Sequence, residues 1–244
     1  MLAGLVSLAA GLGSPRTARA SEPAPVRVGT WDRDGNLLIG VSEAILARLY
    51  ADIGQPMVFV DLPTRRAGQL LAQGQLDANV HRASDFLTAN PDVIALPTPL
   101  NRVAMRAYTL QPTLQALHWK DLAPLRVAHL RGVLRVEQLM LPNQRRVESA
   151  SVRDLWRLLA TDMADVVLVN EMANAPAQHP SGLPELRRLE HVFDEHPVHH
   201  VLWATQARLA SRLNTALIAL QSSGNLDGLQ QSALAGLMRR QGGA

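Results

Sequence analysis

The sequence predicts an α/β fold with a largely parallel sheet. Two observations carry this prediction. Short apolar runs of strand length alternate with longer stretches whose apolar residues recur at helical spacing. In addition, a thirteen-residue pattern of helix end, turn, Asp and apolar strand occurs twice. Because 47% of the 244 residues are hydrophobic, the chain can form one large domain or two small ones.

The first twenty residues have the pattern of a secretory signal peptide. An apolar run from Leu2 to Leu12 is followed by Ala18-Arg19-Ala20, which is an A-x-A cleavage pattern, although no Lys or Arg precedes the run. The run is too short for a stable membrane anchor. We therefore expect residues 1–20 to be a signal peptide removed on export to the periplasm. The alternative is an apolar helix of the mature fold.

The first half of the chain predicts three strands separated by two helices. The strands are expected in VRVGT, in PMVFVDLP and in LDANV, each of which is rich in apolar residues. Between the first two, GVSEAILARLYADIG has apolar residues on one helical face and stops at Gly54. Between the last two, we expect Thr64 to cap a helix over RRAGQLLAQ that stops at Gly74.

The second half repeats the alternation of strands and helices. LRVAHLRG predicts a strand with a glycine turn, VLRVEQLM a helix and RRVESA a short strand. Ser151, with Asp154 three residues later, predicts a capping box at the start of SVRDLWRLL. From Gln206 onward the pattern is helical, with a break at Gly224.

Polar residues follow a buried strand in this half. The run from Val166 to Val169 has the apolar character of a strand buried on both faces, and Asn170 and Glu171 come directly after it. When LLATDMADVVLVN is set beside LLAQGQLDANVHR, Asn170 aligns with Arg82. Two similar halves imply two lobes. Because ligands of open α/β sheets bind outside the carboxyl ends of the strands, both residues should line a cleft between the lobes.

Composition and motifs argue against several other functions. No basic run is interleaved with aromatic residues, which argues against a nucleic-acid partner. The absence of cysteine excludes disulfides and thiolate metal sites. The histidines of HVFDEHPVHH lack the spacing of a zinc site, and no G-x-S-x-G, H-E-x-x-H or P-loop pattern occurs. We therefore expect no metal, no cofactor and no catalytic residue.

Three long segments resemble one protein family. LPTRRAGQLLAQGQLDANVHR, LRVAHLRGV and SVRDLWRLLATDMADVVLVNE resemble the amino-acid-type extracytoplasmic solute-binding proteins, as does the final GNLDGLQQ. The resemblance covers nearly all of residues 26–235 and implies the two-lobed type II periplasmic-binding-protein fold, in a short, divergent member. It implies crossings between the lobes near VAMRAYTL and HHVLWAT. Lobe 1 would comprise residues 26–103 and 201–244, and lobe 2 residues 104–200.

The resemblance also implies a ligand site. The family's usual site holds a ligand carboxylate with an Arg at the position of Arg82, and an α-ammonium with an Asp where this chain has Asn170, followed by Glu171. This departure favours an anion over a zwitterion. We expect Trp31, after the first strand, to form an aromatic wall and Arg131, at a strand–helix turn, to receive an anion.

Each of these site residues has a structural alternative. Arg82 can instead form a surface ion pair with Asp85, Trp31 can be a core residue of its lobe, and Arg131 can belong to an ordinary turn. Glu171 faces the cleft only if the strand has already ended, because successive strand residues point to opposite faces.

The resemblance implies a periplasmic solute-binding protein that captures a small polar or anionic metabolite, an amino acid or a carboxylate, by lobe closure. We expect a monomer without chemistry of its own, whose partner is an ABC permease or a membrane sensor. The alternative is a periplasmic enzyme on the same fold, such as a cyclohexadienyl dehydratase-like lyase, with Glu171 as the general acid.

Overall fold

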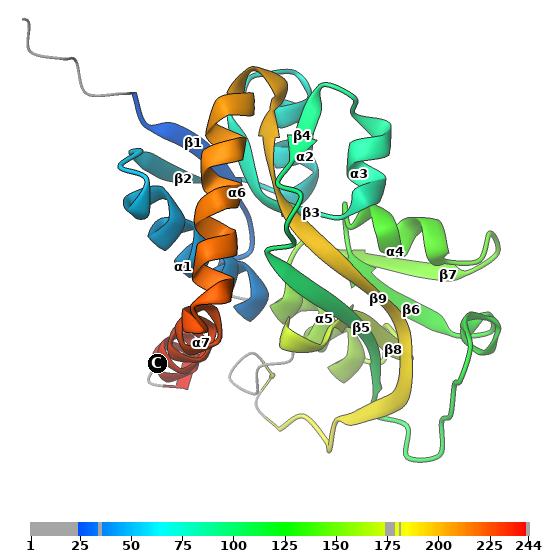
Figure 1. Ribbon diagram of the computed structural model, residues 1–244. Helices are drawn as coiled ribbons and strands as arrows, with labels where there is room; N and C mark the ends of the chain where they lie inside the picture. The colour runs from blue at the N-terminus through cyan, green and yellow to red at the C-terminus, as the bar shows by residue number, and fades with distance from the viewer. Residues whose placement is uncertain (1–23, 34–35, 174–178, 181, 243–244) are drawn as a thin grey trace, which may run out of the picture.

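The computed structural model describes residues 24–33, 36–173, 179–180 and 182–242. The expected signal peptide lies outside the described residues. Two lobes are seen in Figure 1, one with the blue, cyan and orange elements and one with the green and yellow elements. No helix among the described residues is long and apolar enough to cross a membrane.

Lobe 1 is built on three parallel strands in the order β2, β1, β3. The end of β9 extends this sheet as an antiparallel strand beside β3, and the short strand β4 pairs antiparallel with β9, so β4 runs in the same direction as β3. Its elements before the first crossing are β1 (Val26–Thr30), α1 (Leu37–Asp52), β2 (Met57–Asp61), α2 (Thr64–Ala72), β3 (Ala78–Arg82), α3 (Ser84–Ala89) and β4 (Val93–Ala95). The alternation of strands and helices predicted for this half is therefore confirmed.

Lobe 2 repeats the plan with strands in the order β9, β5, β8, β6, β7. Strands β6, β7 and β8 are parallel, whereas β5 is antiparallel to both of its neighbours. Its elements are β5 (Asn101–Thr109), η1 (Trp119–Leu122), β6 (Arg126–Leu130), α4 (Leu134–Leu139), β7 (Arg145–Ser149), α5 (Val152–Ala160), β8 (Val166–Asn170) and η2 (Glu171–Ala173). The sheet is flanked by α4 and α5 and is mostly parallel, as predicted.

One strand belongs to both lobes. The strand β9 (Arg187–Trp203) pairs with β5 as far as Val198, and from His199 onward it pairs with β3 and β4. The expected division of the lobes at 103/104 and 200/201 falls inside β5 and β9. After β9 the chain forms η4 (Ala204–Gln206), α6 (Ala207–Ser222) and α7 (Asn225–Gly242), and both long helices pack on α1 of lobe 1.

The structure corrects the predicted start of one helix and confirms the predicted cap of another. The prediction that Thr64 caps α2 is wrong, because Pro63 is the N-cap residue and Thr64 is already helical. The helix α1 begins three residues before Gly40, and Asn36 caps it by accepting a hydrogen bond from the backbone N–H of Leu38. The cap at Ser151 is confirmed, since its Oγ accepts from the backbone N–H of Asp154 at 3.1 Å.

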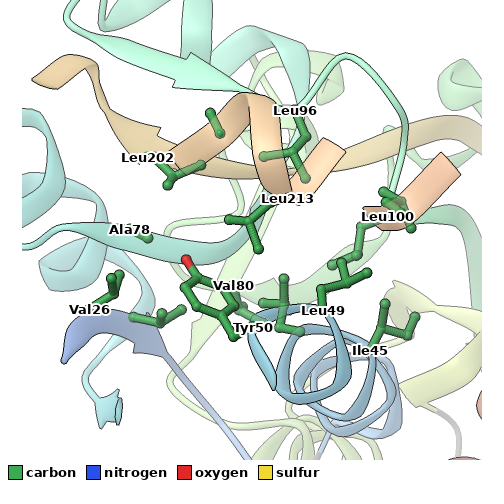
Figure 2. Close-up of a cluster of buried hydrophobic side chains, with 14 of the residues drawn as sticks. Val26, Ile45, Leu49, Tyr50, Ala78, Val80, Leu96, Leu100, Leu202 and Leu213 are labelled. Atoms are coloured by element: carbon green, nitrogen blue, oxygen red, sulfur yellow. The ribbon is translucent and has the colours of Figure 1, made fainter. Parts of the chain in front are cut away.

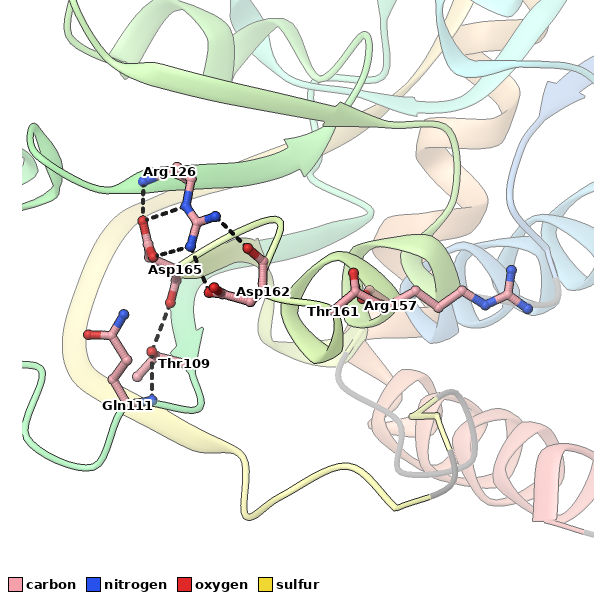
Figure 3. Close-up of polar contacts among 7 residues, drawn as sticks. All are labelled: Thr109, Gln111, Arg126, Arg157, Thr161, Asp162 and Asp165. Atoms are coloured by element: carbon pink, nitrogen blue, oxygen red, sulfur yellow. Dashed lines mark hydrogen bonds and ion pairs between the residues drawn. The ribbon is translucent and has the colours of Figure 1, made fainter.

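The repeated pattern has the same local structure in both lobes. Asp77 accepts a hydrogen bond from the backbone N–H of Arg27 at 2.8 Å, and Asp165 accepts one from the backbone N–H of Arg126 at 2.6 Å. In each case the carboxylate joins the turn after a helix to the start of the neighbouring strand, as Figure 3 shows for lobe 2. The two Asp residues therefore fix the strands β3 and β8 in equivalent positions.

Each lobe has its own apolar core. In lobe 1, α1 packs Ile45, Leu49 and Tyr50 against strand and α6 residues (Figure 2), and these side chains are almost fully buried. In lobe 2 the buried residues of β8 divide between the two faces of the sheet, with Leu168 on one side and Val167 on the other. The five buried residues of β8 agree with the prediction of a strand covered on both faces.

Candidate functional site

A cavity of about 580 Å³ lies between the lobes. Lobe 1 contributes Trp31 after β1, one side of α2, and the end of β3. Lobe 2 contributes the segment 132–137 at the start of α4, and residues of β5 and β8. The cavity therefore lies at the carboxyl ends of the parallel strands, where ligands of open α/β sheets bind.

Arg82, the last residue of β3, is buried in the wall of this cavity. Its side-chain Nη2 donates to the backbone carbonyl of Thr64 at 2.9 Å. The guanidinium stacks between two rings, with its Cζ 4.4 Å from the Trp31 centroid and 4.8 Å from the Phe86 centroid. A Cβ at Gly68 would lie 3.3 Å from Nη2, so the glycine leaves room for the arginine.

The charge of Arg82 has no counter-ion among the described residues. Its Nε is buried and makes no hydrogen bond. The alternative of an ion pair with Asp85 is not formed, because Asp85 pairs with Arg135 at 3.4 Å. Burial lowers the pKa of Arg82 to about 9, so the guanidinium is still protonated at neutral pH. The cavity wall therefore holds an unmatched positive charge.

Asn170 occupies the equivalent end of β8. The residue is 8% exposed, and its Oδ1 accepts from the backbone N–H of Met172 at 3.4 Å. Its Nδ2 is buried and makes no hydrogen bond in the described part of the chain. Both aligned residues of the repeat thus lie in the cavity lining, and each has a buried N–H group without an acceptor.

Two further residues of lobe 1 complete the wall around Arg82. Trp31 lines the cavity and also packs in the core of lobe 1. It is therefore both a wall residue of the cavity and a core residue of its lobe. His81 meets the Trp31 ring edge to face, with centroids 5.6 Å apart, and its Nδ1 lies 3.0 Å from Ser42 Oγ. Burial, with the nearby charge of Arg82, lowers the pKa of His81 to about 3, which leaves it neutral.

Two of the predicted site residues are not brought to the cavity. Glu171 lies in η2 and pairs with Arg106 at 3.4 Å and with Arg188, outside the cavity lining. Arg131 is 56% exposed at its side chain and pairs with Glu148 at 2.8 Å. The cavity therefore unites Arg82, Asn170 and Trp31, while Glu171 and Arg131 form ion pairs elsewhere.

Contacts across the cleft hold the lobes together. The Arg135 guanidinium of lobe 2 reaches Asp85 of lobe 1, and Asp32 of lobe 1 accepts from the backbone N–H of Val152 at 3.2 Å. Gly132, with a φ of +81°, approaches α2 so closely that a Cβ would lie 3.1 Å from the backbone nitrogen of Arg65. The lobes are thus in contact around the cavity.

The histidines of HVFDEHPVHH have separate partners. His199 lies 2.8 Å from the carbonyl of Leu96, and His196 lies 2.6 Å from a carboxylate oxygen of Asp194. His200 is buried, 3.0 Å from the hydroxyl of Tyr50. Within the described ranges, no group of three or more His, Asp or Glu side chains is placed to hold a metal ion.

Comparisons of the sequence give one distant relative. No protein-family model matches the chain. An uncharacterized protein of Shewanella oneidensis is 26% identical over 137 residues, which are 54% of this chain and 52% of that protein. The chain thus spans about half the length of the curated relative it matches.

Solved structures identify the fold. A histidine kinase sensor domain with similarity to periplasmic binding proteins matches with a TM-score of 0.76 at 17% identity, over 88% of this chain and 98% of that one. The GluR0 ligand-binding core in complex with L-glutamate matches at 0.74 and 16%, over 88% and 100%. The amino acid ABC transporter substrate-binding protein AbpA of Streptococcus pneumoniae, bound to L-arginine, matches at 0.70 and 15%, over 88% and 95%. The chain has the two-lobed fold of the periplasmic binding proteins. At these identities the likeness concerns the fold alone.

Proposed function

We propose that this chain is an extracytoplasmic solute-binding protein that captures a small polar or anionic metabolite by closure of its lobes. The observation that carries the proposal is Arg82, a buried cation in the wall of the inter-lobe cavity whose Nε has no hydrogen-bond partner within the described part of the chain. A buried charge without a counter-ion is costly. A ligand carboxylate that accepts from the guanidinium compensates this cost, so the cavity favours an anionic group next to Arg82.

A membrane partner belongs to the same proposal. The solved structures with this fold include a histidine kinase sensor domain and an ABC transporter substrate-binding protein. By analogy we propose that the bound chain is recognised by a permease or by a sensor in the membrane. A periplasmic location and removal of residues 1–20 are part of this proposal. N-terminal sequencing of exported protein should start at Ser21, and an intact Met1 would contradict it.

The enzyme alternative receives no support from the position of Glu171. A general acid must reach the reacting group, and this carboxylate is held by Arg106 and Arg188 away from the cavity lining. The arginine and the amide at the two strand ends support a binding site in the cavity.

Binding without turnover is the decisive test of the proposal. Purified protein is screened by thermal shift against amino acids and small carboxylates, hits are titrated by calorimetry, and the bound compound is recovered and identified by mass spectrometry. We expect at least one compound to bind and to return unchanged. Recovery of a converted product would replace the binding function by an enzymatic one, and no binding by any compound would refute it.

A further inference from the structure

We infer that the cavity takes a carboxylate with an apolar body and without an α-ammonium group. This inference rests on the proposed function and narrows its ligand class. Three features of the cavity carry it: the pairing of its carboxylates, the donor at the end of β8, and the apolar residues of its lobe 2 wall.

Both carboxylates in the cavity lining already have partners. Asp85 faces the guanidinium of Arg135 at 3.4 Å. Glu137 accepts from the backbone N–H of Gly132 at 2.8 Å and lies 3.7 Å from Arg65. An ammonium group entering the cavity would have to compete with these cations for the two carboxylates that the described lining offers. The other charged side chains of the described lining form ion pairs, whereas Arg82 does not, so its charge is available to a ligand.

The end of β8 offers a donor where an ammonium needs an acceptor. The Oδ1 of Asn170 is engaged by the backbone N–H of Met172, whereas its buried Nδ2 has no partner among the residues that the structure describes. An ammonium carries only donors, so the Nδ2–H groups and an ammonium would oppose one another. An oxygen of the ligand, such as the second oxygen of its carboxylate or a carbonyl, satisfies Nδ2 instead.

The rest of the ligand meets an apolar surface. Met105 of β5, Leu168 of β8 and Val198 of β9 line the cavity from lobe 2, and Leu38 joins them from α1. All four belong to one buried cluster and are at most 4% exposed. On the Arg82 side the rings of Trp31 and Phe86 complete the apolar surface. Against this apolar surface a polar group would lose its hydration without gaining hydrogen bonds, so the part of the ligand that faces it should be apolar, although Gln69, Gln73 and Asn90 line the cavity elsewhere.

His81 does not change the preference of the cavity for an acid without an ammonium group. Its side chain is part of the cavity lining, but the ring is neutral because burial lowers its pKa, and its Nδ1 is hydrogen-bonded to the Ser42 hydroxyl. The cavity volume of about 580 Å³ lies in the range of small-molecule sites, roughly 300–1,000 Å³, and accommodates a phenyl or branched alkyl body.

The test compares three pairs of acids whose members differ only in the α-ammonium group, with an apolar body in two pairs and a body that ends in a second carboxylate in the third. The probes are 3-phenylpropionate with L-phenylalanine, 4-methylpentanoate with L-leucine, and glutarate with L-glutamate, each titrated by calorimetry at pH 7. We expect at least one of the two apolar acids to bind ten-fold or more tightly than its amino acid, and both apolar acids to bind better than glutarate.

Substitution of Asn170 by Asp is the matched variant. Asn170→Asp replaces the free donor by a carboxylate of the same size, and we expect it to move the preference at least ten-fold toward L-phenylalanine. If the amino acids bind the unmodified protein better than the apolar acids, or if glutarate does, the inference is wrong while the solute-binding function stands. If no member of any pair binds, the inference is wrong, and the solute-binding function is then decided by the broader screen.

Discussion

The guanidinium of Arg82 stacks over the ring of Trp31, with 4.4 Å between Cζ and the ring centroid. The stack fixes the cation at the end of β3, so a ligand carboxylate meets a donor that is already oriented. We therefore expect Arg82→Ala to weaken binding of a carboxylate by about 1.5–3 kcal/mol, the range of a charge-assisted hydrogen bond. Calorimetry of this variant is compared with Arg131→Ala, which removes an exposed arginine outside the cavity lining and should leave the affinity unchanged. Unchanged affinity in Arg82→Ala would show that Arg82 does not bind the ligand carboxylate.

The three residues at the strand ends should differ in importance. Asn170→Ala removes a neutral donor from the cavity, and we expect a loss of about 0.5–1.5 kcal/mol in binding. Glu171→Ala should have the smallest effect, because Glu171 pairs with Arg106 and Arg188 outside the cavity. The same titrations measure all three variants. A larger loss in Glu171→Ala than in Arg82→Ala would reverse this order and return Glu171 to the site.

Gly132 tests the contact between the lobes. An added Cβ would lie 3.1 Å from the backbone nitrogen of Arg65 across the cleft, at a positive φ that strains any L-residue. We expect Gly132→Ala to weaken ligand binding by ten-fold or more, and small-angle scattering of the ligand-free variant to give a larger radius of gyration. Gly224→Ala is the control, because Gly224 has a φ of +72° but no described atom lies within 4 Å of the added Cβ. Equal effects of both substitutions on affinity would show that strain alone is responsible.

Asp165 should stabilise lobe 2 in a pH-dependent way. Its hydrogen bonds with Arg126 lower the pKa of the carboxyl below its usual 3.8. A lowered pKa means stability that is present above about pH 4 and lost as the pH falls further. We expect Asp165→Asn to lower the free energy of unfolding by about 1.5–3 kcal/mol at pH 7.

The difference between Asp165→Asn and the unmodified protein should narrow below pH 4 in urea denaturation. Glu195→Gln is the matched control, since Glu195 forms an exposed ion pair with Arg102 and its loss should cost less than about 1 kcal/mol. Equal destabilisation by both variants at pH 7 would contradict the structural role of Asp165.

His81 gives a second pH dependence. Burial lowers its pKa to about 3, whereas in the unfolded chain the pKa returns to the ordinary 6.5. Between these values the unfolded state binds the extra proton, so stability falls as the pH falls from 6.5 toward 3. His81→Gln removes this proton, and we expect the slope of unfolding free energy against pH to decrease by up to about 1.4 kcal/mol per pH unit. An unaltered slope in denaturation series from pH 4 to 6.5 would show that His81 is already protonated in the folded protein.

Much of the fold is predictable because local signals agree. The short apolar runs become β1, β3, β6 and β8, and the repeat correctly aligns Arg82 with Asn170 because the same Asp joins turn and strand in both lobes. Since the two strands are equivalent in two facing lobes, and ligands of open α/β sheets bind at the carboxyl ends of the strands, the alignment predicts that both residues face the cavity between the lobes.

The directions of side chains beyond the strand ends were not predictable. The strand β8 stops at Asn170 and the chain turns into η2, so the alternation of strand side chains no longer fixes where Glu171 points. The ion pair of Arg135 with Asp85 depends on how the two lobes meet, and no local pattern in the sequence encodes that. His81 was missed for a simpler reason: a single histidine in an apolar strand gives no signal of its cavity position.

The continuous course of β9 has a mechanical consequence. Because β9 is hydrogen-bonded to β5 at one end and to β3 and β4 at the other, it joins the sheets of the two lobes directly. Rotation of one lobe against the other must twist β9, because neither end of the strand can change its register without breaking a row of backbone hydrogen bonds. Any such rotation would therefore deform β9 near Pro197 and Val198, where its pairing changes from β5 to β3 and β4.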